Sequence, residues 1–236
     1  MKRQQIFPLQ MESLRKPVAN ILLISMIFAA MFAILWWGGG SALQTAHALF
    51  AMDSTQIWWY VTRASGLTGY FLLWLSMVWG FAIPSKIIRP ILDNVFTYDF
   101  HEQLSLVGLG FVVLHVGVLL LDKYLPFNIF QLLIPFLDSY RPFWVGLGIL
   151  SFYVLLLVTF TFYVRSQLGS KAFRSIHVFS LVGYLGTTLH GLFAGTDSAL
   201  PVTMFLYAGT FLVVVFMTVY WLYMRIFGRD TKPVAA

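Results

Sequence analysis

The chain has 236 residues, of which 59% are hydrophobic and 10% are charged. A soluble domain has about 25% charged and 45–50% apolar residues, so the composition excludes an ordinary soluble protein. Fifteen basic and nine acidic residues give a net charge of +6. Because the basic residues lie in short segments between apolar runs, we interpret them as topology signals rather than as a nucleic-acid-binding surface. The absence of cysteine excludes disulfides, thiolate-bound metals and covalent C-x-x-C-H attachment of a cofactor.

Long apolar runs match the ~20 residues that cross a bilayer as a helix. They predict six spanning helices, over residues 18–37, about 57–83, about 100–121, 143–164, 173–193 and 202–227. Pro84 is expected to stop the second helix. Residues 122–141 contain Pro126 and Pro135 and are too short to span, so this segment is expected at the membrane interface.

The basic residues predict the orientation of this bundle. With the N-terminus in the cytoplasm, 12 of the 15 basic residues lie inside and only Arg63, Lys123 and Arg141 lie outside. The predicted fold is therefore all-α, a polytopic membrane bundle of six helices with both termini cytoplasmic. It divides into a cytoplasmic N-terminal segment (1–17), a transmembrane domain (18–227) and a cytoplasmic tail (228–236).

Four of the five histidines lie on only two of the predicted helices. His101 and His115 stand at i and i+14 on the third helix, and His177 and His190 stand at i and i+13 on the fifth. Ionisable residues inside a membrane are costly and usually face a cavity, a partner or a cofactor. A 14-residue interval separates two side chains by roughly 21 Å along a helix and about 40° around it, so the third helix presents two imidazoles on one face.

The third and fifth helices run in the same direction, so their histidines are expected to meet in level pairs. His101 would oppose His177 and His115 would oppose His190. Two imidazoles that face each other across a gap are the axial ligands of a non-covalently bound b-type haem. The sequence therefore predicts two haems, one near each membrane face. Hydrogen bonding of these histidines within the bundle is the alternative for each of them.

Glycines between the histidines fit a haem wedged between helices, because they let the backbone approach without a Cβ. Gly108 lies between the first two histidines, and Gly183 and Gly186 lie between the last two. Glycine is also common where membrane helices pack, and the sequence leaves both roles open. The 13-residue interval places His177 and His190 roughly 140° out of register on an ideal helix, so the fifth helix must deviate or turn irregularly near His177.

Three segments together resemble the ferric reductase-like transmembrane domain. They are residues 59–76 with Arg63-Ala64-Ser65-Gly66, the His101/His115 pair, and residues 173–198, which run from Phe173-Arg174-Ser175-Ile176-His177 through His190-Gly191 to Gly195-Thr196-Asp197-Ser198. That family includes the membrane cores of NADPH oxidases and metalloreductases and the haem-binding membrane subunit of bacterial methionine sulfoxide reductase. The resemblance covers residues 57–227.

The resemblance implies a b-type cytochrome that moves electrons across the membrane, with His101, His115, His177 and His190 as haem ligands. Arg174 is similar to a basic residue of the family, where it would pair with a haem propionate; a topology-setting role is the alternative. Arg63 interrupts an apolar helix start, and an outer-haem propionate, an anionic acceptor or snorkelling would each explain it.

NADPH oxidases continue into a flavin- and nicotinamide-binding domain, whereas this chain ends soon after the sixth helix and has no G-x-G-x-x-G pattern. Electrons are therefore expected from a separate flavoprotein, another membrane subunit or quinol; a bound flavin or quinone is not indicated by the sequence. We expect an electron-transfer subunit of an oxidoreductase in the bacterial plasma membrane, in contact with lipid and a redox partner.

With both axial positions filled by imidazole, each haem is expected to act as a one-electron relay. The expected path runs from a cytoplasmic donor to the His101/His177 haem, then to the His115/His190 haem, then to an outer acceptor. Glu102 is expected at the headgroup boundary, with tuning of the inner haem or proton transfer to a quinone as alternatives. Asp197 is expected in a turn or helix cap, with acceptor or cation binding as the alternative. The alternative function is a haem-bearing or haem-free accessory subunit of a larger membrane complex.

Overall fold

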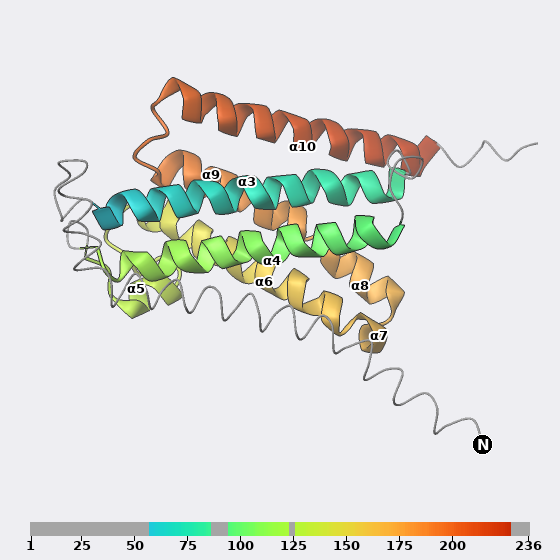
Figure 1. Ribbon diagram of the computed structural model, residues 1–236, viewed down its shortest axis with the longest axis horizontal. Helices are drawn as coiled ribbons and strands as arrows, with labels where there is room; N and C mark the ends of the chain where they lie inside the picture. The colour runs from blue at the N-terminus through green and yellow to red at the C-terminus, as the bar shows by residue number, and fades with distance from the viewer. Residues whose placement is uncertain (1–56, 86–93, 123–125, 228–236) are drawn as a thin grey trace, which may run out of the picture.

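The structure is a computed structural model that describes residues 57–85, 94–122 and 126–227. These residues form an all-α bundle (Figure 1). Its long helices are α3 (Ile57–Ser85), α4 (Asn94–Leu119), α6 (Pro142–Tyr163), α9 (Ser180–Ala194) and α10 (Pro201–Phe227). Its short helices are α5 (Ile129–Leu133), α7 (Arg165–Leu168) and α8 (Ser170–His177). The predicted helix over 18–37 and the predicted tails lie outside the described residues.

Five helical segments of the described residues are long and apolar enough to cross a membrane. They are Ile57–Pro84, Val95–Leu119, Pro142–Tyr163, Ser170–Ala194 and Pro201–Ile226. The fourth of these segments contains both α8 and α9. The chain is thus an integral membrane protein with an all-α polytopic bundle, and five of the six predicted spans have a counterpart in it.

The helix boundaries differ from the predicted ones at two places. The second span was expected to end before Pro84, but α3 includes Pro84 and ends at Ser85. Only the last turn of the helix is affected, where few backbone hydrogen bonds remain to be lost. Helix α4 begins at Asn94, several residues before the predicted start at 100, because polar residues such as Asp99 hide this turn from an apolar pattern. Between α4 and α6, the described residues of the expected interfacial segment (122 and 126–141) contain one short helix, α5.

The helices are arranged as two closely packed antiparallel pairs, α3 with α4 and α6 with α9, and α10 lies against α3 and α9 (Figure 1). Small residues allow the close approach within each pair. A Cβ added at Gly69 would lie 3.3 Å from the carbonyl oxygen of Gly108, across the α3–α4 contact. The α3–α4 pair therefore packs at close to backbone contact at this point.

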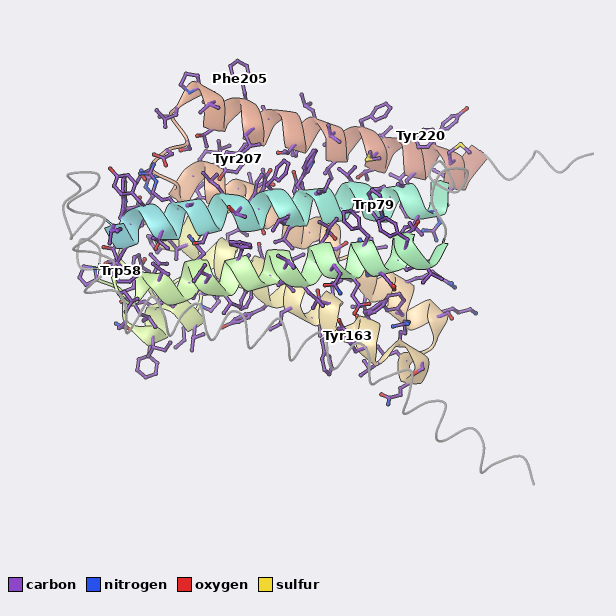
Figure 2. All side chains as sticks on the ribbon, in the orientation of Figure 1. Trp58, Trp79, Tyr163, Phe205, Tyr207 and Tyr220 are labelled. Atoms are coloured by element: carbon purple, nitrogen blue, oxygen red, sulfur yellow. The ribbon has the colours of Figure 1, made fainter. Side chains whose placement is uncertain are left out.

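A buried cluster of hydroxyl groups joins α10 to the rest of the bundle. The Tyr70 hydroxyl lies 2.6 Å from the Thr210 hydroxyl and 3.0 Å from the Tyr184 hydroxyl, which connects α3 with α10 and α9. Figure 2 shows Tyr207 between α10 and the bundle, whereas Phe205 and Tyr220 point away from it. Phe205 is 78% exposed, as expected for a side chain that meets lipid.

Candidate functional site

The structure brings the four membrane histidines together in two pairs, and these are the pairs that the helix spacing predicts. The ring centroids of His101 and His177 are 6.0 Å apart, with their planes at 66°. Those of His115 and His190 are 6.4 Å apart, with their planes at 77°. Helix α4 supplies one member of each pair, and α8 and α9 supply the other members.

The irregularity predicted from the 13-residue interval lies directly after His177. Helix α8 ends at His177 and α9 begins at Ser180, so the fifth span is broken at Val178 and Phe179. The N–H of Phe179 donates to the carbonyl of Ile176 at 3.0 Å, a tightened turn of the 3₁₀ type. The break changes the register of the span, so that His177 and His190 both reach a partner on α4.

Backbone carbonyl groups of neighbouring helices fix the orientation of three of the four rings. The Nδ1 atoms lie 3.0 Å from the Ser76 carbonyl for His101, 2.8 Å from the Thr62 carbonyl for His115, and 2.9 Å from the Trp144 carbonyl for His190. A carbonyl oxygen can only accept a hydrogen bond, so Nδ1 carries the proton in each of these rings. The other ring nitrogen, Nε2, then keeps its lone pair, which is the form of imidazole that binds a metal.

Each accepting carbonyl lies four residues before a glycine of the same helix. These glycines are Gly66 and Gly80 on α3 and Gly148 on α6. Residues four apart lie on one face of a helix, so a side chain at the glycine would crowd the ring that approaches the carbonyl. An added Cβ would lie 2.6 Å from the His190 ring at Gly148 and 2.8 Å from the His115 ring at Gly66. We call each such carbonyl and glycine a bracket.

The role of these three glycines was not predicted from the sequence, where Gly66 entered only as part of the Arg63–Gly66 motif, although one signal was present. Gly66 and Gly80 repeat the interval between His101 and His115, which lie on the adjacent antiparallel helix. Matching intervals on antiparallel neighbours place the residues level in pairs. A comparison of intervals between consecutive helices therefore points to Gly66 and Gly80.

The three glycines that the sequence singled out instead contact neighbouring helices. An added Cβ at Gly108 would lie 3.0 Å from the Leu73 side chain of α3. At Gly183 it would lie 2.8 Å from the Leu155 side chain of α6, and at Gly186 it would overlap the Ser151 hydroxyl of α6. The structure thus supports their helix-packing role and not close contact with the histidines.

A cavity surrounds each histidine pair. The cavity at His101 and His177 has a volume of about 1170 Å³, and the cavity at His115 and His190 has a volume of about 240 Å³. Tyr70, Leu155 and Thr187 line both cavities. In the described part of the chain no three His, Asp or Glu side chains form a group that could hold a metal ion. Each pair offers two nitrogen ligands to a metal.

Charged groups differ between the two cavities. Lys171, Arg174 and Arg225 line the large cavity around the His101/His177 pair. Glu102 lines the same cavity and accepts a hydrogen bond of 2.8 Å from the Tyr163 hydroxyl. Figure 2 shows Tyr163 near the α6 end that leads to α7.

Arg63 lines the small cavity and already has a carboxylate partner. Its guanidinium forms an ion pair with Asp197 and lies 3.7 Å from the centre of the Trp59 ring. The sequence did not indicate this ion pair, because Arg63 and Asp197 lie far apart along the chain. Asp197 also accepts a backbone hydrogen bond from Leu200, consistent with its expected place in a turn.

The fold and the site define an all-α integral membrane protein in which two pairs of imidazoles face each other inside cavities, one pair towards each end of the bundle. A comparison with known proteins finds no matching family, no similar curated protein and no similar solved structure. The resemblance to the ferric reductase-like domain therefore stays a hypothesis based on sequence motifs.

Proposed function

We propose that this protein is a membrane cytochrome that binds two b-type haems and relays single electrons between the two faces of a membrane. The observation that carries the proposal is the presence of two facing histidine pairs in which three of the four rings donate from Nδ1 to a backbone carbonyl. A ring held in this way keeps a lone pair on Nε2, so the arrangement suits a metal between the rings of each pair.

The distance between the rings of each pair fits an iron atom between them. A metal–imidazole bond is about 2 Å long, as for zinc, and the nitrogen lies roughly 1 Å from the ring centre, so a shared metal places the centroids roughly 6 Å apart. The observed separations are 6.0 Å and 6.4 Å. Two ligands are too few for a stable site of a bare ion, whereas a porphyrin supplies four further nitrogens.

The surroundings of the pairs also suit an amphipathic macrocycle. The cavities lie between the α3–α4 pair and the α6–α9 pair and are lined largely by apolar side chains such as Leu155. Lys171, Arg174 and Arg225 supply positive charge for propionate groups at the large cavity, whereas Arg63 at the small cavity is paired with Asp197. When bound, haem supplies an iron that accepts and releases one electron.

The chain's own residues have three roles in this proposal. The carbonyl groups of Thr62, Ser76 and Trp144 hold the protonated Nδ1 atoms and turn Nε2 towards the cavity. A hydrogen bond of this kind raises the basicity of the ligating nitrogen. The apolar walls exclude water, and the buried Tyr70 borders both sites.

The positive-inside rule orients the electron path. It places the His101/His177 pair at the cytoplasmic face of a bacterial plasma membrane, where a flavoprotein or quinol would donate, and the His115/His190 pair near an outer acceptor. The protein would then be the electron-transfer subunit of an oxidoreductase and would work with a redox partner or within a larger complex.

A haem-free accessory subunit is the second candidate, and one observation favours it. Three of the four histidines form hydrogen bonds within the bundle, as expected of structural histidines. Those three bonds use only Nδ1, however, and leave the lone pair on Nε2 of His101, His115 and His190 available to a metal. The two candidates therefore differ in whether the purified protein contains haem.

The test is a spectrum of the purified full chain, reduced with dithionite and compared with the oxidised form, together with a pyridine haemochrome count. We expect b-type bands and two haems per chain. The variant His115→Ala should lose one haem, because its site would keep only one ligand.

The matched control is His47→Ala, which changes the one histidine that lies outside the described residues and is expected to keep both haems. A wild-type protein purified without haem from cells with ample haem supply, with no Soret band after reconstitution, would contradict the proposal and favour the accessory subunit.

A further inference from the structure

The four histidines are not held equally, because His177 has no bracket. Its Nδ1 atom is buried and has no hydrogen-bond partner among the described residues, whereas the Nδ1 atoms of His101, His115 and His190 all have one. Metal-binding histidines almost always donate this N–H to a carbonyl, a carboxylate or water. The His101/His177 pair is therefore fixed on one side only.

The sequence of α6 explains the missing bracket. On α3 the second bracket glycine follows the first at the same interval that separates the two histidines of α4. On α6 the corresponding positions after Gly148 are Thr161 and Phe162, and both carry side chains. Thr161 is buried, and its hydroxyl donates to the carbonyl of Val158 on its own helix. No glycine at those two positions leaves space for the His177 ring to approach a carbonyl of α6.

The backbone at His177 is also less constrained than at the other three histidines. His177 is the last residue of α8 and is followed by the break at Val178 and Phe179, whereas His190 lies within the continuous helix α9. The surrounding cavity of about 1170 Å³ leaves room for the ring to move. His115 and His190 share only about 240 Å³.

We propose that His177 is an exchangeable ligand, so that a small neutral molecule with a vacant π orbital, such as CO, binds the ferrous iron at the His101/His177 pair and not at the His115/His190 pair. This inference rests on the proposed function, since it requires haem at both pairs. In the exchange the bond between iron and Nε2 of His177 breaks and a bond between iron and the ligand forms. No electron is transferred, and the iron stays ferrous.

The lost hydrogen bond sets the size of the effect. Partners of this kind change metal affinity by about 10- to 100-fold, so His177 is expected to bind that much more weakly than the three bracketed histidines. CO can bind to a six-coordinate haem only after one of the two axial ligands has left the iron. It should therefore bind where the weakest imidazole lies.

The experiment exposes the dithionite-reduced full chain to CO and records the difference spectrum against the haem count. We expect CO to bind half of the haem. In His177→Ala the bracketed His101 is expected to keep the haem, because the weakly held His177 contributes less to haem affinity than His115 does at its own site. CO should then bind the same half at least about tenfold faster, since no imidazole has to leave first. In His115→Ala, which is expected to retain only the His101/His177 haem, CO should bind all the remaining haem.

The His115→Ala variant also decides the matter if His177→Ala does not fold. A protein with two haems that binds no CO, or binds CO at both haems, overturns the inference and leaves the proposed function intact. Retention of haem without CO binding in His115→Ala overturns it as well. Absence of haem from the wild-type protein contradicts the proposed function instead, so the two failures are distinguishable.

Discussion

In each histidine pair a ring of α4 faces a ring of the fifth span, on α8 in one pair and on α9 in the other. The surroundings of the two pairs differ. Around His115 and His190 the cavity is about 240 Å³, and both rings are held by brackets. Around His101 and His177 it is about 1170 Å³, and one ring has no bracket. The difference indicates that the same pairing of imidazoles can be built as a rigid site or as an adaptable one, depending on the residues behind the rings.

The charges differ in the same direction. At the small cavity Arg63 is paired with Asp197, so that its charge is largely balanced. At the large cavity Lys171, Arg174 and Arg225 outnumber the one acidic residue that lines it, Glu102. The large cavity is therefore the larger and the more positively charged of the two. We expect an anionic donor or donor protein to approach the bundle at the end that contains this cavity.

The largest effect is expected from a substitution that fills a bracket glycine of the His115/His190 site. In Gly148→Ala the new Cβ would lie 2.6 Å from Nδ1 and 2.7 Å from Cγ of His190, so the ring must move away from the Trp144 carbonyl. We expect the affinity of this site for haem to fall by about 10- to 100-fold, which is measured by haemochrome count after haem titration.

Gly209→Ala is the matched control, because a Cβ there meets nothing within 4 Å. It should leave the haem content unchanged. If Gly148→Ala keeps both haems at wild-type affinity, the bracket does not hold His190 in the way described.

A weaker effect is expected at the bracket of the adaptable site. In Gly80→Ala the nearest atom to the new Cβ would be Cε1 of His101 at 3.1 Å, and the large cavity lets the ring shift. We expect less than about a tenfold loss of haem affinity, measured by the same titration. If Gly80→Ala lost more haem affinity than Gly148→Ala, the His101/His177 site would be the less adaptable of the two, contrary to the proposal.

The smallest effect is expected from the ion pair of the small cavity. Asp197→Asn removes the carboxylate beside Arg63, and because the two side chains are 30% and 19% exposed we expect less than about 1 kcal/mol of lost stability. Loss of a negative charge favours the reduced iron, so the midpoint potential of the nearer haem should rise while the other stays constant. A potentiometric titration that moves both haems equally would contradict this assignment of Asp197.

The arrangement of spans and histidines could be predicted from the sequence because it depends on regular helix geometry. The lengths of the apolar runs locate the five described spans, and the intervals between histidines indicate which rings meet. The interval between His177 and His190 even indicated a helix irregularity, which the structure has after His177. The ligand roles of these residues stay predictions.

The glycines could not be assigned in the same way, because their role depends on which neighbour each one faces. Gly108 and Gly183 lie on the same helices as the histidines but contact Leu73 and Leu155. Gly66 and Gly148 lie on helices that carry no histidine of their own. Contacts across helices depend on register, which an apolar pattern does not fix, and the pairing of Arg63 with Asp197 was missed for the same reason.

Helix α3 contributes no imidazole, yet it positions both imidazoles of α4, and α6 does the same for His190. Each antiparallel hairpin thus contains ready-oriented donor atoms before the two hairpins meet. Under the proposed function, haem would join two hairpins that already hold ligands in place through their own carbonyl groups. We expect that starving cells of porphyrin would leave the hairpins intact while weakening their association.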